Sequence, residues 1–366
     1  MERKMGSVQI PGTKYVSQSS QMLVSSGIPA LDEILGGGLP VGTVALIEED
    51  MYGTYAKVVL KYFIAEGVVC KHSVFLASQD SSPHEVIKEI PAVIHFDQEN
   101  TTSFSEPKSS DTKMKIAFRY EKLPTQEVED KHITLGHFYD LTKSMPLSDI
   151  ENTDIYYWNG SRVENGVSSF SNPAYNDLLR QIKTKIKDDK YFLKDNPSKK
   201  SILRIALHSL GSPLWLPVRN SLHSLDSSRD LDMFIFCLRA LVRSALAVAV
   251  ITIPSHLYRE HALERCIHSS DISMRLQSFA GTELETNKVL SDYHGFFQLT
   301  KLAPINSFAS RHPGSLEYVF KLRRKKFVIE KLHLPPDIED TSSDRSNKGK
   351  IITPGCHGTN RQLLDF

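Results

Sequence analysis

Short runs of apolar residues alternate along the chain with longer segments whose apolar residues recur every three or four positions. The short runs predict strands at Thr43–Glu48, Ser73–Ala77, Ile202–Leu207 and Leu246–Ile253. The longer segments predict helices over Tyr55–Val69, over Pro173–Ile186 behind the candidate caps Ser171 and Asn172, and over Leu231–Val242. The strands are apolar throughout, so both sheet faces must be buried, as helical crossovers between parallel strands achieve. The sequence therefore predicts an α/β fold with a mostly parallel central sheet and helices on both faces.

The pattern changes to alternating apolar and polar residues toward the end of the folded part. This alternation predicts strands at Phe296–Leu302, Leu316–Leu322 and Phe327–Leu334, with a turn at Arg323–Lys326. We expect an antiparallel C-terminal hairpin that closes the sheet.

Segments poor in apolar residues set the expected domain boundaries. We expect a flexible N-terminal tail at 1–20, one α/β domain at 21–335 and a flexible C-terminal tail at 336–366. Within the domain, the Ser/Thr/Lys-rich residues around 100–113 predict a flexible insertion.

Charge and cysteine content exclude several classes of protein. The 44 Lys and Arg nearly cancel the 43 Asp and Glu, so the net charge of +1 provides no global field for nucleic acid, and any RNA contact needs a local patch. The 4 cysteines are widely separated, which is typical of reduced thiols in the cytoplasm or nucleus. The N-terminus lacks the apolar stretch of a signal peptide, and charged residues interrupt the longest apolar region, Leu231–Ile253, so we expect no membrane partner.

An acidic loop between the first predicted strand and its helix carries the candidate chemistry. Strand, loop and helix follow the order of the phosphate-binding motif G-x-x-x-x-G-K-[ST], whose N–H groups and lysine bind phosphates while its hydroxyl binds magnesium. In that frame the chain keeps Gly53, but Glu48 replaces the first glycine, Thr54 the lysine and Tyr55 the hydroxyl. The segment predicts a degenerate nucleotide-binding loop.

The charge of this loop opposes nucleotide binding. Glu49 and Asp50 place negative charge beside the expected triphosphate, and no lysine in the loop offsets the repulsion. The strand that should end in a metal-binding aspartate ends instead in His208 and Ser209. We therefore expect no cofactor, no metal and no catalytic residue in this chain, while ATP contact at a subunit interface stays open.

Several separated motifs in one order resemble the PAXNEB-type subunits of the Elongator complex. The similar segments are LVSSGIPALDEILGGGLPVGTVALIEEDMYGTYAKVVLKYFIAEGV from Leu23, MKIAFRYE from Met114, HFYDLTKSMP from His137 and RIALHSLGSPLW from Arg204. The resemblance covers roughly residues 20–335, and the family's first motif shares the acidic, lysine-free loop.

The resemblance implies a RecA-like fold and a role in a larger assembly. Family members form a hexameric ring with two related RecA-like subunits, and the ring docks on the catalytic Elongator subcomplex. The assembly modifies carbon 5 of the wobble uridine, U34, in certain tRNAs, with the chemistry in another subunit. The ring binds tRNA and is linked to ATP-dependent release. The resemblance therefore implies a non-catalytic ring subunit, located in the cytoplasm and nucleus.

Two rival interpretations remain. An active P-loop ATPase or recombinase-like motor would need unorthodox phosphate contacts. A direct RNA-binding module would use the densest basic run, Arg323, Arg324, Lys325 and Lys326, although a solvated turn is the more common explanation of such a run. Tyr52 and Tyr55 fit either base stacking or a subunit interface.

Overall fold

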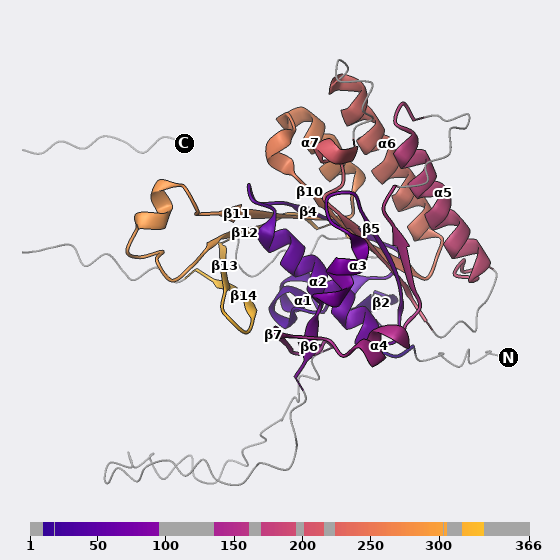
Figure 1. Cartoon of the computed structure of the whole chain (residues 1–366), viewed down its shortest axis with the longest axis horizontal. Coiled ribbons are helices and arrows are strands. Elements are labelled where there is room, and N and C mark those ends of the chain that lie inside the picture. Colours follow the sequence, from indigo (N-terminus) through magenta and orange to yellow (C-terminus); the bar gives the residue numbers. More distant parts are fainter. Residues whose placement is uncertain are drawn as a thin grey trace, which may run out of the picture. The chain divides into compact units, whose positions relative to one another are not determined.

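A computed structural model describes residues 10–17, 19–94, 135–160, 170–194, 201–215, 224–302, 304–305 and 317–332 (Figure 1). The predicted insertion at 100–113, the predicted tail at 336–366 and the motif from Met114 lie outside these residues. Among the described residues, the strands of the main sheet are β4 (Val44–Glu48), β5 (Ser73–Ser78), β8 (Ile155–Trp158), β9 (Leu203–His208), β10 (Ala247–Ile253), β11 (Ile272–Ser278), β12 (Gly295–Leu302), β13 (Tyr318–Leu322) and β14 (Phe327–Lys331).

These strands form one sheet in the order β14-β13-β12-β11-β4-β10-β9-β5-β8. The neighbouring strands β8, β5, β9, β10, β4 and β11 are parallel to one another. The remaining pairs, β11 with β12, β12 with β13 and β13 with β14, are antiparallel. Every residue of β4, β5, β9 and β10 is buried, as their unbroken apolar runs predict. The predicted mostly parallel sheet and its antiparallel C-terminal hairpin are confirmed.

Helices cover both faces of the sheet (Figure 1). They are α1 (Pro29–Leu35), α2 (Thr54–Val69), α3 (Pro83–Lys88), α4 (Leu147–Glu151), α5 (Pro173–Asp188), α6 (Ser224–Arg243) and α7 (Glu260–Ser269). One apolar cluster joins α1, α2 and α3 to one face, and another joins α5, α6 and α7 to the other. The α5 start follows the prediction, because Pro173 is in the first turn and Asn172 Oδ1 accepts the Ala174 N–H at 2.9 Å.

Two small sheets supplement the core. β1 (Thr13–Val16), β2 (Gln21–Val24) and β3 (Leu39–Pro40) form one, and β6 (Pro91–Val93) and β7 (Tyr139–Ser144) form the other. A flexible tail was predicted for residues 1–20, but part of this segment forms strand β1. Residues 1–9 and 18 lie outside the described part. The tail prediction fails at 13–16 because these residues pair with β2 and because Ile10 is buried in the core.

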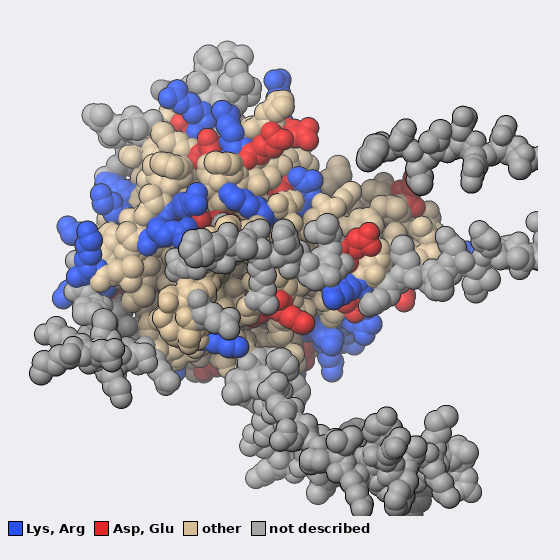
Figure 2. Space-filling model, turned by 180° about the vertical axis from the view of Figure 1, so that it is seen from behind, with Lys and Arg blue, Asp and Glu red and all other residues tan. Residues whose placement is uncertain are grey.

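No described helix combines the length and the apolarity needed to cross a bilayer. Charges of both signs mix over the face seen in Figure 2, in keeping with the net charge of +1.

A buried guanidinium fixes α2 against the sheet. Arg204 of β9 is fully buried, and it donates hydrogen bonds to His72 Nδ1 at 3.0 Å, to Ser25 O at 2.9 Å and to Phe63 O at 3.1 Å. Its guanidinium also lies 4.8 Å from the centre of the Phe63 ring. Burial alone would raise the pKa of Glu66, but hydrogen bonds from His137 and the nearby charge of Arg204 lower it to about 2. This network joins β9, α2 and the segments after β2 and α2.

The Arg204 side chain packs closely against α2 at Gly67, where there is no side chain. We therefore predict that Gly67→Ala destabilises the protein. An added Cβ would lie 2.7 Å from Arg204 Cδ and 3.2 Å from Val74 Cγ2. We expect the substitution to lower the free energy of unfolding by about 1–3 kcal/mol, although alanine is intrinsically the better helix former. Urea denaturation measures this change. The exposed α5 control Thr184→Ala should be neutral or slightly stabilising, and a stabilising Gly67→Ala would contradict the packing.

Candidate functional site

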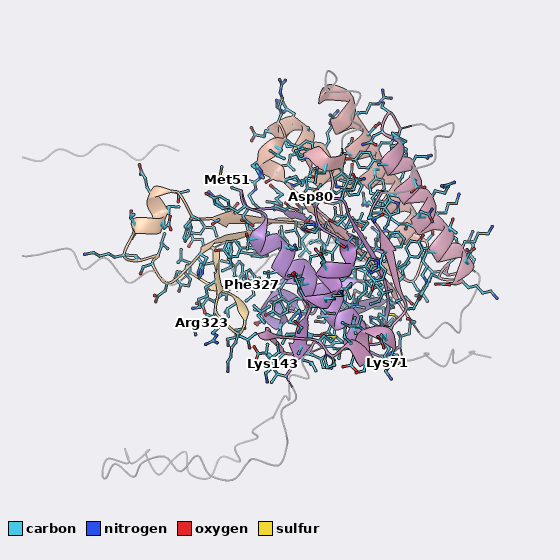
Figure 3. All side chains as sticks on the ribbon, in the orientation of Figure 1. Met51, Lys71, Asp80, Lys143, Arg323 and Phe327 are labelled. Atoms are coloured by element: carbon cyan, nitrogen blue, oxygen red, sulfur yellow. The ribbon has the colours of Figure 1, made fainter. Side chains whose placement is uncertain are left out.

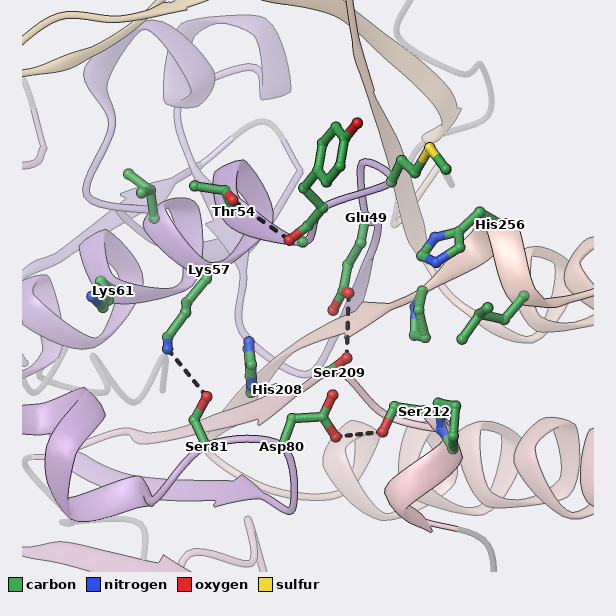
Figure 4. A pocket seen from close by; sticks show the side chains of 17 residues that line it. Glu49, Thr54, Lys57, Lys61, Asp80, Ser81, His208, Ser209, Ser212 and His256 are labelled. Atoms are coloured by element: carbon green, nitrogen blue, oxygen red, sulfur yellow. Dashed lines mark hydrogen bonds between the residues drawn. The ribbon is translucent and has the colours of Figure 1, made fainter. Parts of the chain in front are cut away.

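A pocket of about 520 Å³ opens beside the acidic loop, where the parallel strands end (Figure 4). Its walls come from the β4–α2 loop, the first turns of α2, and the segments that follow β5, β9 and β10. Ligands of parallel α/β sheets bind at this end of the strands. The pocket is lined by Glu49, Met51, Tyr52, Gly53, Thr54, Lys57, Val58, Lys61, Asp80, Ser81, His208, Ser209, Ser212, Pro213, Pro254, His256 and Leu257.

The loop satisfies its own backbone amides with a carboxylate. Asp50 Oδ1 accepts the Tyr55 N–H at 3.1 Å, and Asp50 Oδ2 accepts the Tyr52 N–H at 3.2 Å. Gly53 adopts a left-handed conformation with φ 64°, and its N–H donates to Asp50 O at 2.9 Å. In a phosphate-binding loop such amides point at the phosphate. Here an internal anion occupies them and also neutralises the positive end of α2.

Glu49 extends toward the pocket floor and is only 6% exposed. Its Oε2 accepts a hydrogen bond from Ser209 Oγ at 3.3 Å, while Oε1 has no partner among the described residues. Burial raises the pKa of Glu49 to about 7, with smaller upward contributions from the Asp80 and Asp50 charges. The side chain is therefore close to half ionised at neutral pH.

Two predicted site residues turn away from the pocket. Glu48, at the end of β4, is fully buried and its Oε2 accepts from Arg275 Nε at 2.6 Å. Burial raises the pKa of Glu48, and the contact with Arg275 opposes that rise. The Tyr55 ring packs with its centroid 4.7 Å from that of Phe320 in β13. The position of the magnesium-binding hydroxyl thus holds a half-buried aromatic residue that packs against the core.

The end of β9 lies in the pocket, which brings His208 and Ser209 close to the acidic loop. His208 Nδ1 is 3.0 Å from Ser78 Oγ, and burial, with the nearby Lys57 charge, lowers the His208 pKa to about 4. The imidazole is therefore neutral at physiological pH. Ser209 has φ 49°, uncommon for a residue with a side chain, and its N–H donates to Thr252 Oγ1 at 2.7 Å. Of the predicted loop, Glu49, Gly53 and Thr54 line the pocket with His208 and Ser209.

Sequence reasoning missed the basic residues of the pocket. Lys57 and Lys61 follow Thr54 by three and seven positions, a spacing that places them on the Thr54 face of α2. Lys57 Nζ donates to Ser81 Oγ at 3.1 Å, and Lys61 Nζ forms an ion pair with Glu89 Oε2 at 2.8 Å. This helical spacing from Thr54 is the signal that could have identified both.

The predicted basic run lies at another site. Met51 and Asp80 lie at the carboxyl ends of the parallel strands, whereas Arg323 and Phe327 lie at the β13–β14 turn (Figure 3). Arg323–Lys326 lines a second pocket of about 660 Å³, together with residues that include Tyr62 and Phe138. None of the four cations forms an ion pair with another described residue.

One described group, Glu66, Cys70 and His137, has the spacing of metal ligands, with the candidate atoms within 4.8 Å of one another. The sequence did not single out this group. Its geometry also explains a hydrogen-bonded network, because Glu66 accepts from Tyr139 Oη at 2.6 Å and from Cys70 Sγ at 3.3 Å. Burial and the Glu66 charge raise the Cys70 pKa to about 12, so the thiol stays protonated, and metal binding would require its ionisation beside the Glu66 carboxylate. We interpret the group as structural.

Comparison with known proteins yields similarities along nearly the whole chain. A family model described as "PAXNEB protein" matches residues 6–366. Elongator complex protein 4 of Xenopus laevis is 40% identical over 95% of this chain and 89% of its own length. Elongator complex protein 4 of Homo sapiens is 38% identical over 98% of this chain and 89% of its own.

Among solved structures, the KaiC-like protein PH0186 of Pyrococcus horikoshii matches with a TM-score of 0.44 and 14% identity, over 84% of this chain and 98% of its own.

The raised pKa of Glu49 predicts a pH-dependent stability that Glu49→Gln removes. Because the folded-state pKa of about 7 exceeds the ordinary 4.5, the folded state binds more protons between these values. The free energy of unfolding should therefore fall as pH rises from about 4.5 to 7, by on the order of 3 kcal/mol from this group.

Urea denaturation of both proteins between pH 5 and 8 isolates the Glu49 contribution, because Asp32 and Glu48, whose pKa values are also raised, titrate in both. Parallel curves for wild type and Glu49→Gln would show that Glu49 titrates normally.

Proposed function

The chain belongs to the PAXNEB family, and from this premise we propose that it is a non-catalytic RecA-like subunit of the Elongator complex. In this proposal it joins two related RecA-like subunits in a hexameric ring that docks on the catalytic Elongator subcomplex. The ring supports modification of the tRNA wobble uridine at carbon 5, including tRNA binding and release, in the cytoplasm and nucleus.

The observation that carries the non-catalytic role is the occupation of the loop amides by Asp50. The Tyr52 and Tyr55 N–H groups already donate to its carboxylate. A triphosphate would have to displace this carboxylate and then lie beside it and beside Glu49. Like charges at such distances repel, and the lysine and hydroxyl positions hold Thr54 and Tyr55. We therefore propose that no nucleotide cofactor binds here in the usual P-loop manner.

The outer surface of the loop supports a role in assembly. Met51 is 69% exposed and Tyr52 is 62% exposed at the tip of the acidic loop. Large exposed apolar side chains beside a pocket are typical of protein interfaces, where buried aromatic residues contribute much of the binding energy. Retention of the fold with loss of the phosphate chemistry is what a subunit selected for contact would show.

A tRNA contact within this role is supported by the second pocket. The four cations of Arg323–Lys326 are not neutralised by ion pairs with described residues, and they lie beside the aromatic side chains of Tyr62 and Phe138. Cations without ion-pair partners bind RNA phosphates, and the exposed ring of Phe138, unlike the buried ring of Tyr62, can stack on an unpaired base.

Substitution of both loop-tip residues tests the assembly. The double variant Met51→Asp, Tyr52→Asp should bind the two related subunits at least tenfold more weakly, because it places two charges in an apolar contact. Analytical ultracentrifugation of the co-expressed proteins measures the loss. Tyr15→Asp, at an equally apolar site that is 60% exposed on β1, provides the control and should assemble normally.

A wild-type chain that stays monomeric with both partners would contradict the ring. Magnesium-dependent ATP turnover by the isolated chain, abolished by Asp50→Ala, would instead support the motor interpretation.

Charge reversal of the turn tests the RNA contact. We expect replacement of Arg323–Lys326 by glutamates to weaken tRNA binding by the assembled ring and to reduce the salt dependence of the affinity, by up to about 3.6 in the slope of log K against log salt for duplex contacts. Filter binding at several salt concentrations measures both. Reversal of Lys183 and Lys187, exposed on α5, is the control. An unchanged slope would show that the turn is only solvated surface.

A further inference from the structure

The pocket contains a carboxylate with one oxygen that lacks a hydrogen-bond partner in the described part of the chain. Glu49 Oε1 is buried and has no hydrogen-bond partner among the described residues, although the side chain lines a pocket large enough for a ligand group. A buried charged oxygen without a donor costs free energy, and a donor that enters the pocket recovers it. The pocket therefore favours a group that donates hydrogen bonds to Glu49.

The charges around Glu49 determine the sign of that group. The neighbours that act on its carboxylate are the hydroxyls of Thr252 and Ser209 and the carboxylates of Asp80 and Asp50. Asp50 is committed to the loop amides, whereas Asp80 accepts one hydrogen bond, from the Ser212 hydroxyl. Lys57, on the α2 side of the pocket, donates to the Ser81 hydroxyl (Figure 4). Lys61 forms an ion pair with Glu89. The part of the pocket between Glu49 and Asp80 thus attracts a cation and repels an anion.

The geometry favours an organic cation over a metal ion. A metal site needs several ligand atoms close together. Among the described residues, three candidate ligand atoms within 4.8 Å of one another occur at Glu66, Cys70 and His137, and not at Glu49, Asp50 and Asp80. A planar guanidinium has a different requirement, because it spans two acceptors and donates two parallel hydrogen bonds to one carboxylate.

The rim of the pocket indicates that the cation belongs to a protein. Three lining residues are large, apolar and exposed: Met51 at 69%, Tyr52 at 62% and Leu257 at 52%. An apolar rim around a polar centre excludes water when a partner surface covers it, and the central contact then becomes strong. Aromatic side chains such as Tyr52 also stack on the flat face of a guanidinium.

We propose that this pocket receives an arginine side chain of a neighbouring ring subunit, whose guanidinium binds Glu49 and Asp80. The proposal rests on the ring assembly of the proposed function and adds the chemistry of the contact. In an ordinary phosphate-binding loop the bound nucleotide carries the negative charge. In this proposal the chain itself carries the negative charge on its carboxylates, and the bound group is a cation.

Titration of the isolated full chain with N-acetyl-L-argininamide, followed by NMR, tests the site without any partner. We expect saturable, millimolar binding that Glu49→Gln weakens at least tenfold, because the isosteric amide removes the charge and keeps the shape. Glu85→Gln, the same change at an exposed α3 position, should bind like wild type, and N-acetyl-L-citrullinamide, a neutral analogue, should not bind. Equal binding by wild type and Glu49→Gln, or no binding to wild type, would overturn the proposal.

Assembly measurements separate this proposal from the proposed function. With the two related subunits, Glu49→Gln should raise the dissociation constant of the assembly at least tenfold. The melting temperature of the Glu49→Gln chain at pH 7 should not be lower than that of wild type. The control Glu85→Gln should leave the dissociation constant unchanged. Assembly of wild type and Glu49→Gln with equal affinity would overturn the arginine contact and leave the ring intact. Failure of the wild-type chain to assemble would refute the ring itself.

Discussion

The buried guanidinium of Arg204 is the constraint on which the rest of this structure depends. A guanidinium without access to water needs hydrogen-bond acceptors and an opposite charge within the protein, and Arg204 Nε and Nη1 donate to His72, to the segment after β2 and to α2. Glu66 balances the charge and in turn accepts hydrogen bonds from His137 and Tyr139. Because these partners lie far apart in sequence, their alignment fixes α2 over β9. The first turn of α2 then presents the acidic loop and Lys57 to the pocket.

The loop at the start of α2 provides its own anion for the amides of the turn. Amides at a helix start need an acceptor, which in a phosphate-binding loop is a phosphate. Asp50 supplies that acceptor from within the chain, so the turn is stable without a ligand. Glu49 then remains as a partly ionised group on the pocket floor. Two adjacent carboxylates thus have different surroundings: Asp50 stabilises the turn, whereas Glu49 lines the pocket.

Much of the fold could be predicted from sequence because its central strands are buried on both faces. The sequence runs that form β4, β5, β9 and β10 contain few polar residues, and the folded structure keeps the strand conformation that these runs predict. Strand β11 was missed because Arg275 and Gln277 interrupt its apolar pattern, and Arg275 is there to pair with Glu48, 227 positions away. The predicted loop residues were found in part: Glu49, Gly53 and Thr54 line the pocket, whereas Glu48 and Tyr55 face the core. Such orientations depend on long-range packing, which spacing alone cannot reveal.

The tilted packing of the Tyr55 ring against Phe320 limits how this loop can change. Its replacement by serine, as a magnesium site requires, would remove this packing between α2 and the C-terminal hairpin and destabilise the fold. Substitutions at Thr54 and Asp50 alone would not create a magnesium site while the aromatic ring stayed in place. A phosphate-binding loop would therefore need several coordinated substitutions in this sequence, whereas the exposed surface of the pocket can vary one residue at a time.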